Sequence, residues 1–371
     1  MAEWKEYTLG ELLQYEQPTA YIVKSTDYND NYKTPVLTAG KTFILGYTNE
    51  RQGVYDELPV IIFDDFTTAS QYVNFKFKVK SSAMKILKAN AGLVLPKFVF
   101  YRMQIIKFDA STHKRYWIQH YSKIKVKIPP TISEQEHIIS RIEELFSQLD
   151  VSVNELKTAK ERLKVYRQAV LKEAFEKVKV HIPFGKIIDA RLGKMLDKEK
   201  NTGNYRKYLR NINVRWFSFD LSDLLEMRIE DDEIEKYSVS HNDLIICEGG
   251  EPGRCAVWDK HDSIFYQKAL HRVRFLDNSN PKFYMYYLWF SAQAGQLCRY
   301  FTGTGIKHLT GQSLSKVVVP KTDRPTQDSI VAEIESRLSV CDSIENTVDT
   351  ALQQAEALLQ SILKKAFEGK L

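Results

Sequence analysis

A long stretch of this sequence occurs twice, and that repetition constrains the fold more than any other feature. Residues 135–176 align without a gap with residues 327–368, which lie 192 positions further along the chain. The identical pairs extend along the alignment: Gln135 with Gln327, Ile142-Glu143 with Ile334-Glu335, and Ala174-Phe175-Glu176 with Ala366-Phe367-Glu368. An ungapped alignment of this length indicates an internal duplication.

Both copies are predicted to be long helices. Neither contains Pro or Gly, and apolar residues recur at alternating spacings of three and four, as in the seam of a coiled coil. The predicted seam consists of Ile142, Leu145, Leu149, Leu156, Ala159, Leu163, Tyr166 and Val170, and of Ile334, Cys341, Ile344, Val348, Ala351, Ala355, Leu358 and Ile362. Ser133 with Glu136 forms a predicted capping box, and Pro325 falls in the first turn of the second helix. Two related helices can bury their seams against each other, so we expect an antiparallel coiled coil.

Each helix follows a globular segment, and these two segments differ far more than the helices do. Runs of apolar residues typical of strands alternate with turns rich in Gly, Asn and Asp. Both segments open with a short amphipathic element and close with a strand that runs into proline. The predicted fold class is α+β, mixed α and β, with a pseudo-two-fold internal repeat. The predicted division is globular domains at residues 1–131 and 179–323, and helices at residues 132–178 and 324–371.

The positive charge of the chain is concentrated in two places. The net charge is only +6, yet residues 97–127 hold eight Lys or Arg against a single acid, and residues 177–215 hold eleven against three acids. Clustered positive charge is typical of a surface that binds phosphate. No apolar run approaches the ~18–20 residues that cross a bilayer, and residues 1–16 lack the apolar core of a signal peptide. We therefore expect a cytoplasmic protein without membrane contacts, whose four cysteines are ordinary buried thiols.

Several motifs, in a fixed order, resemble those of a known family. A strand leads through Pro129-Pro130 to Ser133-Glu134-Gln135, and residues 363–371 read Leu-Lys-Lys-Ala-Phe-Glu-Gly-Lys-Leu. Residues 249–254 read Gly-Gly-Glu-Pro-Gly-Arg after a strand, and residues 303–309 read Gly-Thr-Gly-Ile-Lys-His-Leu before the last strand. Over essentially its whole length the chain resembles the specificity subunits of type I restriction–modification systems. It departs from them in the first segment, which has no clear copy of the glycine loop, and at Arg324-Pro325-Thr326-Gln327, which lacks the usual Glu-Gln.

The resemblance implies a protein that reads a bipartite target in double-stranded DNA through two target recognition domains. It also implies methyltransferase subunits as partners, restriction subunits in the full complex, and no catalytic centre or cofactor in this chain. Residues 301–305 have the Phe-x-Gly-x-Gly pattern of methyltransferases that bind AdoMet. However, the only Pro-Pro pair precedes Thr131 instead of the aromatic residue that adenine methylation requires. The eight histidines are scattered, and none is assigned to a metal.

The candidate DNA-contacting residues are basic or polar side chains on predicted loops, because Lys and Arg bind phosphates and polar groups read base edges. Counting back from the closing prolines places Lys114-Arg115-Tyr116-Trp117 opposite residues 305–308. Tyr116 is expected as the aromatic member of a DNA-facing loop, with a core position as the alternative. The candidates are Lys114, Arg115, Tyr116, Thr67, Thr68 and Gln71 in the first segment, and Arg191, Lys194, Arg206, Lys207, Arg210, Gly250, Arg254, Lys307 and His308 in the second.

Three alternatives stay open at this point. The chain could serve a related system in which nuclease and methylase are fused in one polypeptide, and neighbouring genes would distinguish this case. It could be a coiled-coil scaffold for proteins, which predicts no salt-dependent affinity for DNA. It could be a stand-alone methyltransferase, which crosslinking with labelled AdoMet would reveal.

Overall fold

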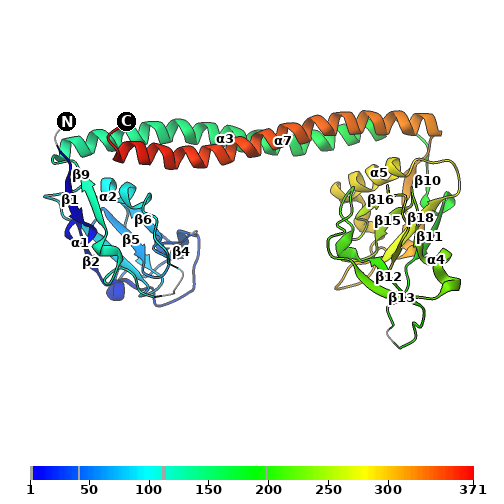
Figure 1. Ribbon diagram of the computed structural model, residues 1–371, viewed down its shortest axis with the longest axis horizontal. Helices are drawn as coiled ribbons and strands as arrows, with labels where there is room; N and C mark the ends of the chain where they lie inside the picture. Colours follow the sequence, from blue (N-terminus) through cyan, green and yellow to red (C-terminus); the bar gives the residue numbers. More distant parts are fainter. Residues whose placement is uncertain (1–2, 41, 111–113, 198) are drawn as a thin grey trace. The chain divides into compact units, whose positions relative to one another are not determined.

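The structure is a computed structural model that describes residues 3–40, 42–110, 114–197 and 199–371. The chain forms two compact units, unit 1 with residues 1–156 and 349–371 and unit 2 with residues 157–348. Two long helices, α3 (Ile132–Glu176) and α7 (Arg324–Phe367), each contribute one part to unit 1 and another part to unit 2 (Figure 1). The mixed α and β class and the two long helices predicted from the sequence are confirmed.

The main sheet of unit 1 has four strands in the order β2-β8-β5-β6, and neighbouring strands are antiparallel. Its central strand β5 is buried on both faces: Ile61 and Phe63 belong to one apolar cluster, and Val60 and Ile62 to another. This explains why the sequence there is a continuous apolar run. A sheet β4-β3-β7 and the pair β1-β9 complete the unit. The elements are β1 (Lys5–Thr8), α1 (Leu9–Leu12), β2 (Leu13–Glu16), β3 (Thr34–Leu37), β4 (Ile44–Thr48), β5 (Val60–Asp64), β6 (Ser70–Val73), β7 (Lys78–Val79), β8 (Met84–Ala89), α2 (Pro96–Met103) and β9 (Lys125–Ile128).

Unit 2 repeats this plan. Its main sheet has the order β11-β18-β15-β16, and its central strand β15 is again buried on both faces, with Leu244 and Ile246 in one cluster and Ile245 and Cys247 in another. A second sheet, β13-β12-β17-β14, and the pair β10-β19 complete it. The elements are β10 (His181–Pro183), β11 (Ile188–Leu192), β12 (Asn204–Leu209), β13 (Leu225–Ile229), α4 (Ile234–Tyr237), β14 (Ser238–Val239), β15 (Leu244–Cys247), β16 (Cys255–Val257), β17 (Ile264–Tyr266), β18 (Leu270–Phe275), α5 (Pro281–Gln293), α6 (Gly311–Lys316) and β19 (Val318–Pro320).

The start of α3 differs from the prediction. The first intrahelical bond runs from Gln135 N to Thr131 O (3.3 Å), so Thr131 is the N-cap residue. Glu134 N donates to the Thr131 hydroxyl (3.3 Å), which in turn donates to the Glu134 carboxylate (3.0 Å). The predicted box of Ser133 and Glu136 is therefore wrong by two residues. In α7, Pro325 lies in the first turn as predicted.

The long helices pair antiparallel. In unit 2, Lys177 contacts Glu333 and Glu173 contacts Arg337, so residue numbers rise along one helix as they fall along the other. At three predicted seam positions, the residue that lies in the seam is the next one along the chain. Tyr166, Ile344 and Leu358 are 44%, 43% and 48% exposed, whereas the following residues Arg167, Glu345 and Leu359 are half-buried. Arg167 and Glu345 form an ion pair inside the seam (2.7 Å). Because both side chains are charged, a search for apolar residues at regular spacing does not find these two seam positions.

Identical residues of the repeat attach each globular segment to the long helices. In unit 1, Gln135 accepts a hydrogen bond from Leu95 N (2.9 Å) at the start of α2. In unit 2, Gln327 accepts one from Asn280 N (2.6 Å) at the start of α5. Both glutamine residues are fully buried. Each supplies a hydrogen-bond acceptor to an N–H group at a helix N-terminus, where N–H groups have no partner within the helix.

In unit 1, α2 packs against parts of α3 and α7, and in unit 2, α5 does the same (Figure 1). Two further contacts recur in both units. The carboxylates of Glu143 and Glu335 bind lysines on α2 and α5, at 2.6 and 2.8 Å. At the end of the repeat, Phe367 packs edge-on against Phe98 of α2, and Phe175 packs likewise against Phe283 of α5. Each unit therefore uses the beginning of one long helix and the end of the other, which explains why both ends of the repeat are preserved.

Candidate nucleic-acid interface

In unit 2, the glycine loop that follows β15 lies against the segment after β12. Asn211 Nδ2 donates to Gly249 O (3.0 Å), and the Arg254 guanidinium donates to Asn211 O (2.9 Å) and pairs with Glu251 (2.8 Å). The side chain of Arg254 is only 16% exposed, so it holds the two segments together and does not present a free cation. Gly250 is exposed with φ of +74°, a conformation that glycine adopts at little cost.

The loop that carries Lys307 and His308 lies beside this glycine loop. A Cβ atom on Gly249 would lie 3.1 Å from His308 Nδ1, so the absence of a side chain there permits the close approach. His308 is held by two backbone hydrogen bonds with Thr302 (2.8 and 2.9 Å). Lys307 is exposed, and its ammonium donates to Gly303 O (2.8 Å). The structure thus brings together two of the loops that the sequence analysis treated separately.

In unit 1, the loop before β9 is attached to Asp65, which follows β5. Asp65 O accepts a hydrogen bond from Tyr116 N (2.9 Å), and Asp65 Oδ1 accepts one from Trp117 N (2.7 Å). Both aromatic side chains are buried, at 3% and 1% exposure. The prediction that Tyr116 faces DNA is therefore wrong, because its ring completes the core. Lys114 and Arg115, directly before it, are exposed.

The turn between β5 and β6 lies next to this loop. Asp64 Oδ1 accepts hydrogen bonds from the N–H groups of Phe66 and Thr67 (2.9 Å each), and Thr68 has a positive φ of 59°. The Arg115 guanidinium lies 6.0 Å from the centre of the Phe66 ring. The predicted candidates Thr67, Thr68 and Arg115 are therefore neighbours.

The loops before the last strands of the two units are equivalent, in a register that differs from the predicted one. Val126 of β9 pairs with Tyr7, and Val319 of β19 pairs with Ile182; counting back from this pair matches Tyr116 with Leu309. The backbone agrees, because Leu309 N donates to Glu248 O (2.7 Å) as Tyr116 N donates to Asp65 O. Lys114 therefore corresponds to Lys307, and Arg115 to His308. The proline-based alignment was wrong by two residues because β9 ends before Pro129, whereas β19 includes Pro320.

Lys194 is not available to bind phosphate. Its side chain is 7% exposed, and it pairs with Glu230 (2.5 Å) and with Glu233. Burial by itself would lower the pKa of Lys194, but the hydrogen bonds with both carboxylates outweigh burial and raise the pKa. The hydrogen bond from Lys194 is also the main cause that lowers the pKa of Glu230 to about 2. The prediction for Lys194 is wrong, because acids of its own unit neutralise it.

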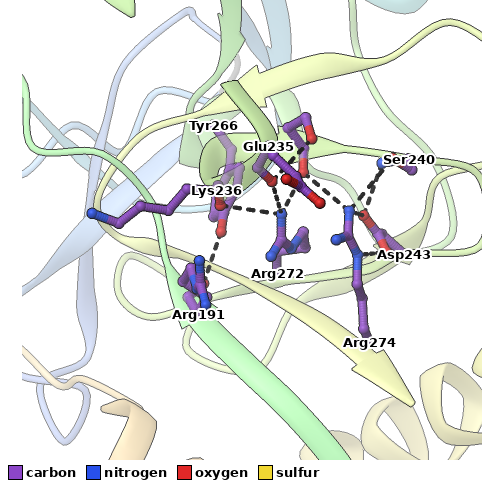
Figure 2. Close-up of polar contacts among 9 residues, drawn as sticks. Arg191, Glu235, Lys236, Ser240, Asp243, Tyr266, Arg272 and Arg274 are labelled. Atoms are coloured by element: carbon purple, nitrogen blue, oxygen red, sulfur yellow. Dashed lines mark hydrogen bonds and ion pairs between the residues drawn. The ribbon is translucent and has the colours of Figure 1, made fainter. Parts of the chain in front are cut away.

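Three arginine residues lie on one face of the β11-β18 pair, as Figure 2 shows for Arg191, Arg272 and Arg274. Buried Arg272 donates to three backbone carbonyl groups at and after the end of α4 (2.6–3.4 Å), and burial lowers its pKa. Arg274 pairs with Asp243 (2.8 Å). Arg191 accepts a hydrogen bond from the Tyr266 hydroxyl through its backbone carbonyl (3.1 Å), while its side chain is exposed. Of these three, Arg191 is exposed, whereas buried Arg272 and half-buried Arg274 bind groups of their own unit.

The other candidates are spread over both units. Arg206 and Arg210 are half-buried and face acids, at 3.8 Å from Asp231 and 2.7 Å from Asp223, whereas Lys207 is exposed. Gln71 lies within β6 and is half-buried. Asn211 and Asp65, which hold the candidate loops in place, were not among the predicted residues. The pair Asp64-Asp65 directly after a buried apolar run is a turn signal that could have indicated the second of them.

The cysteine residues follow the prediction with one exception. Cys247, Cys255 and Cys341 are buried, and burial raises the pKa of Cys247 to about 11 and that of Cys255 well above its ordinary value. Cys298 is exposed, so the prediction was wrong for it. Among the described residues, no three His, Cys, Asp or Glu side chains gather as metal ligands would. In the part of the chain that the structure describes, no helix has the length and apolar character needed to cross a membrane.

Comparison with solved structures shows which known folds this chain resembles. Over 99% of this chain, the fold matches a chain of a structure described as "Structural basis underlying complex assembly and conformational transition of the type I R-M system", with a TM-score of 0.77, 15% identity and 98% of that chain covered. It also matches the HsdS subunit from Thermoanaerobacter tengcongensis, with a TM-score of 0.55, 15% identity and 99% and 97% coverage. The architecture is therefore that of an HsdS-like protein with two sheet-containing segments and two long helices.

Part of the chain is similar in sequence to known specificity subunits. Residues 1–161 match the family described as "Type I restriction modification DNA specificity domain". The chain is 46% identical over 181 residues to the EcoR124I/EcoR124II specificity subunit of Escherichia coli, covering 46% of this chain and 44% of that protein. It is 26% identical over 272 residues to the EcoKI specificity subunit of Escherichia coli (strain K12), covering 68% and 58%. The chain thus spans about half the length of the curated relatives it matches. In sequence the chain is therefore similar to type I restriction–modification specificity subunits, and in fold it is similar to a chain of a type I R-M system.

Proposed function

We propose that this chain determines the DNA specificity of a type I restriction–modification system by reading a bipartite target, one half with each globular segment. The observation that carries the proposal is the repeated loop before the last strand. In each unit this loop is held by a backbone hydrogen bond next to the central strand and presents a basic pair, Lys114-Arg115 in unit 1 and Lys307-His308 in unit 2. Lys114, Arg115 and Lys307 are exposed, whereas His308 is half-buried. Exposed cations on a firmly held loop suit a phosphate backbone, and adjacent polar groups suit base edges.

The neighbouring loops complete each reading surface in this proposal. In unit 1 the turn with Thr67 and Thr68 lies next to Arg115, and hydroxyl groups are able to bond either base edges or phosphates. In unit 2 the glycine loop brings exposed backbone at Gly250 close to His308, so N–H groups can approach phosphate oxygens. Arg191 and Lys207 add exposed positive charge to unit 2.

The proposed division of labour follows the repeat. Residues 1–131 and 179–323 read DNA, whereas residues 132–178 and 324–371 form the paired helices on which methyltransferase subunits, and restriction subunits in the full complex, assemble. The chain is assigned no reaction and no cofactor of its own, and methylation and cleavage belong to its partners. This scheme places the protein in the cytoplasm, where the DNA is.

Methylome sequencing of cells that carry this chain together with its methyltransferase tests the proposal. We expect methylation at a bipartite sequence, and exchange of residues 1–131 for those of another family member should change one half of that sequence. A swap that altered both halves equally, or a methylome without a bipartite motif, would contradict independent reading.

Salt dependence tests the basic pairs directly. Because each lost phosphate contact reduces the slope of log affinity against log salt by about 0.9, Lys114→Ala and Lys307→Ala should each flatten that slope by up to about one. Lys172→Ala, at an exposed position of α3 outside the proposed reading surface, is the matched control and should leave the slope unchanged. DNA affinity of the wild type that did not fall with salt would favour a protein scaffold instead.

A further inference from the structure

Each main sheet carries a buried basic residue at one equivalent position. In unit 1, Lys85 of β8 lies opposite Phe63 of β5. In unit 2, His271 of β18 lies opposite Ile246 of β15. The registers of the adjacent strands agree with this match, because Leu87 pairs with Tyr15 just as Val273 pairs with Ala190. Both basic side chains are 1% exposed.

Lys85 acts on the loop before β9 through Asp65. The Lys85 ammonium lies 3.4 Å from the Asp65 carboxylate, and both side chains are almost fully buried. The second oxygen of that carboxylate accepts the hydrogen bond from Trp117 N (2.7 Å). A carboxylate in a buried place needs a partner, so the contact with the ammonium holds this acceptor in place. The chain of contacts therefore runs from the centre of the sheet to the residues that follow Arg115.

His271 acts on the equivalent loop of unit 2 without an intermediary. Its Nε2 lies 3.0 Å from Leu309 O, and its Nδ1 has no hydrogen-bond partner. Only an N–H can pair with a carbonyl oxygen, so Nε2 carries the proton and Nδ1 is the bare nitrogen. Burial lowers the pKa of His271, which favours this neutral ring. Leu309 directly follows exposed Lys307 and half-buried His308.

We propose that Lys85 and His271 are positioning residues for DNA reading, each fixing the basic loop of its own unit against the centre of its sheet. The inference rests on the proposed function and adds to it the residues that set how accurately each half-site is read. Neither side chain reaches the surface, so neither contacts DNA. Their influence on specificity comes from the position of the loop, since a shift of about 1 Å in a supporting contact is enough to spoil a binding constellation.

Two substitutions at His271 distinguish the loss of the hydrogen bond to Leu309 O from a change in side-chain size. His271→Gln places an amide N–H where Nε2 lies, whereas His271→Asn reaches only the position of Nδ1, which has no partner. Both keep a polar amide in the same buried place. The assay uses the complex with the methyltransferase subunits and compares methylation of the wild-type target with duplexes that carry one base change in either half-site. The half-site read by unit 2 is assigned beforehand by the exchange of residues 1–131.

We expect His271→Asn to reduce discrimination at the unit 2 half-site about tenfold, the equivalent of one hydrogen bond, and to leave the other half-site unchanged. His271→Gln should stay within about twofold of the wild type, because the donor to Leu309 O is retained. The exposed His241→Asn is the matched control and should change neither half-site.

A second pair of variants tests Lys85 in unit 1. Lys85→Met leaves the Asp65 carboxylate buried without a cation and should reduce discrimination only at the unit 1 half-site. The double variant Lys85→Met with Asp65→Asn removes both charges and keeps an acceptor for Trp117 N, so it should restore discrimination. The exposed Lys76→Met is the control, at 68% side-chain exposure. If Lys85→Met does not fold, as judged by its thermal unfolding, the double variant decides.

Three results would overturn the inference. The first is an equal loss of discrimination at both half-sites in any of these variants. The second is a folded His271→Asn variant with full discrimination, and the third is a folded double variant in which discrimination at the unit 1 half-site is not restored. If the proposed function itself were wrong, the wild-type complex would show no sequence preference. That result is seen before any variant is compared, so it differs from the three results above.

Discussion

Replacing Gln135 with leucine should loosen α2 and leave unit 2 untouched. Gln135 Oε1 accepts the hydrogen bond from Leu95 N (2.9 Å), and its Nε2 donates to Leu93 O (3.0 Å). Leucine has a similar volume, so it fills the space but leaves one buried N–H and one buried carbonyl without their partner. Each such group costs about 1–3 kcal/mol, so we expect a local loss of about 2–6 kcal/mol.

Hydrogen exchange with mass spectrometry measures this loss where it arises. Because every 1.4 kcal/mol is a factor of ten, exchange in peptides covering residues 93–103 should become at least about thirtyfold faster, and peptides covering residues 280–293 should not change. Gln327→Leu should give the mirror result. Gln148→Leu, at an exposed position of α3, is the matched control. Equal acceleration in both sets of peptides, or none in residues 93–103, would refute the assignment of these glutamines to local docking.

Three further predictions concern stability. Gly185→Ala should lower the thermal unfolding midpoint of unit 2, since the added Cβ would lie 2.7 Å from Ser315 Cβ and overpacking costs about 1–3 kcal/mol; an unchanged midpoint would contradict the close contact. Glu230 has a pKa of about 2, below its ordinary 4.5, so its contribution is present above pH 4.5 and lost as pH falls towards 2; Glu230→Gln should flatten the stability of unit 2 in that window, in acid titrations followed by tryptophan fluorescence. Arg167→Met should destabilise the helix pair by about 1 kcal/mol in urea at low salt, and by less in 1 M salt, because its two acidic partners on α7 are partly exposed.

The repeat made the long helices predictable, whereas the exact seam was not. Apolar spacing predicted the two helices, and the globular segment between them predicted their antiparallel pairing. The apolar spacing missed the seam at Arg167 and Glu345, because a charged pair buried between two helices looks like surface in a sequence. The predicted seam instead included apolar residues that lie beside the true seam, such as the exposed Ile344.

The candidate loops were predicted in outline and not in register. Glycine and basic residues indicated the loops at residues 249–254 and 303–308, and the structure brings these together. The alignment of the two heads failed by two residues because it was based on prolines, and a strand can end before or at a proline. Lys194 and Tyr116 failed for another reason: exposure depends on distant partners such as Glu230, which a local pattern does not contain.

The matched contacts also explain how the two heads can differ so widely in sequence and yet share one framework. The loops before the last strands are held by backbone groups, Tyr116 N to Asp65 O and Leu309 N to Glu248 O, and backbone bonds do not depend on side-chain identity. Side-chain identity is fixed instead where the heads meet the long helices, as at Gln135 and Gln327. At the centre of the sheets the requirement is intermediate. A buried donor must be present, but a lysine with an acid partner and a neutral histidine both meet it. Under the proposed function, variation is tolerated most at the exposed loop residues, which is where a change of DNA target would require it.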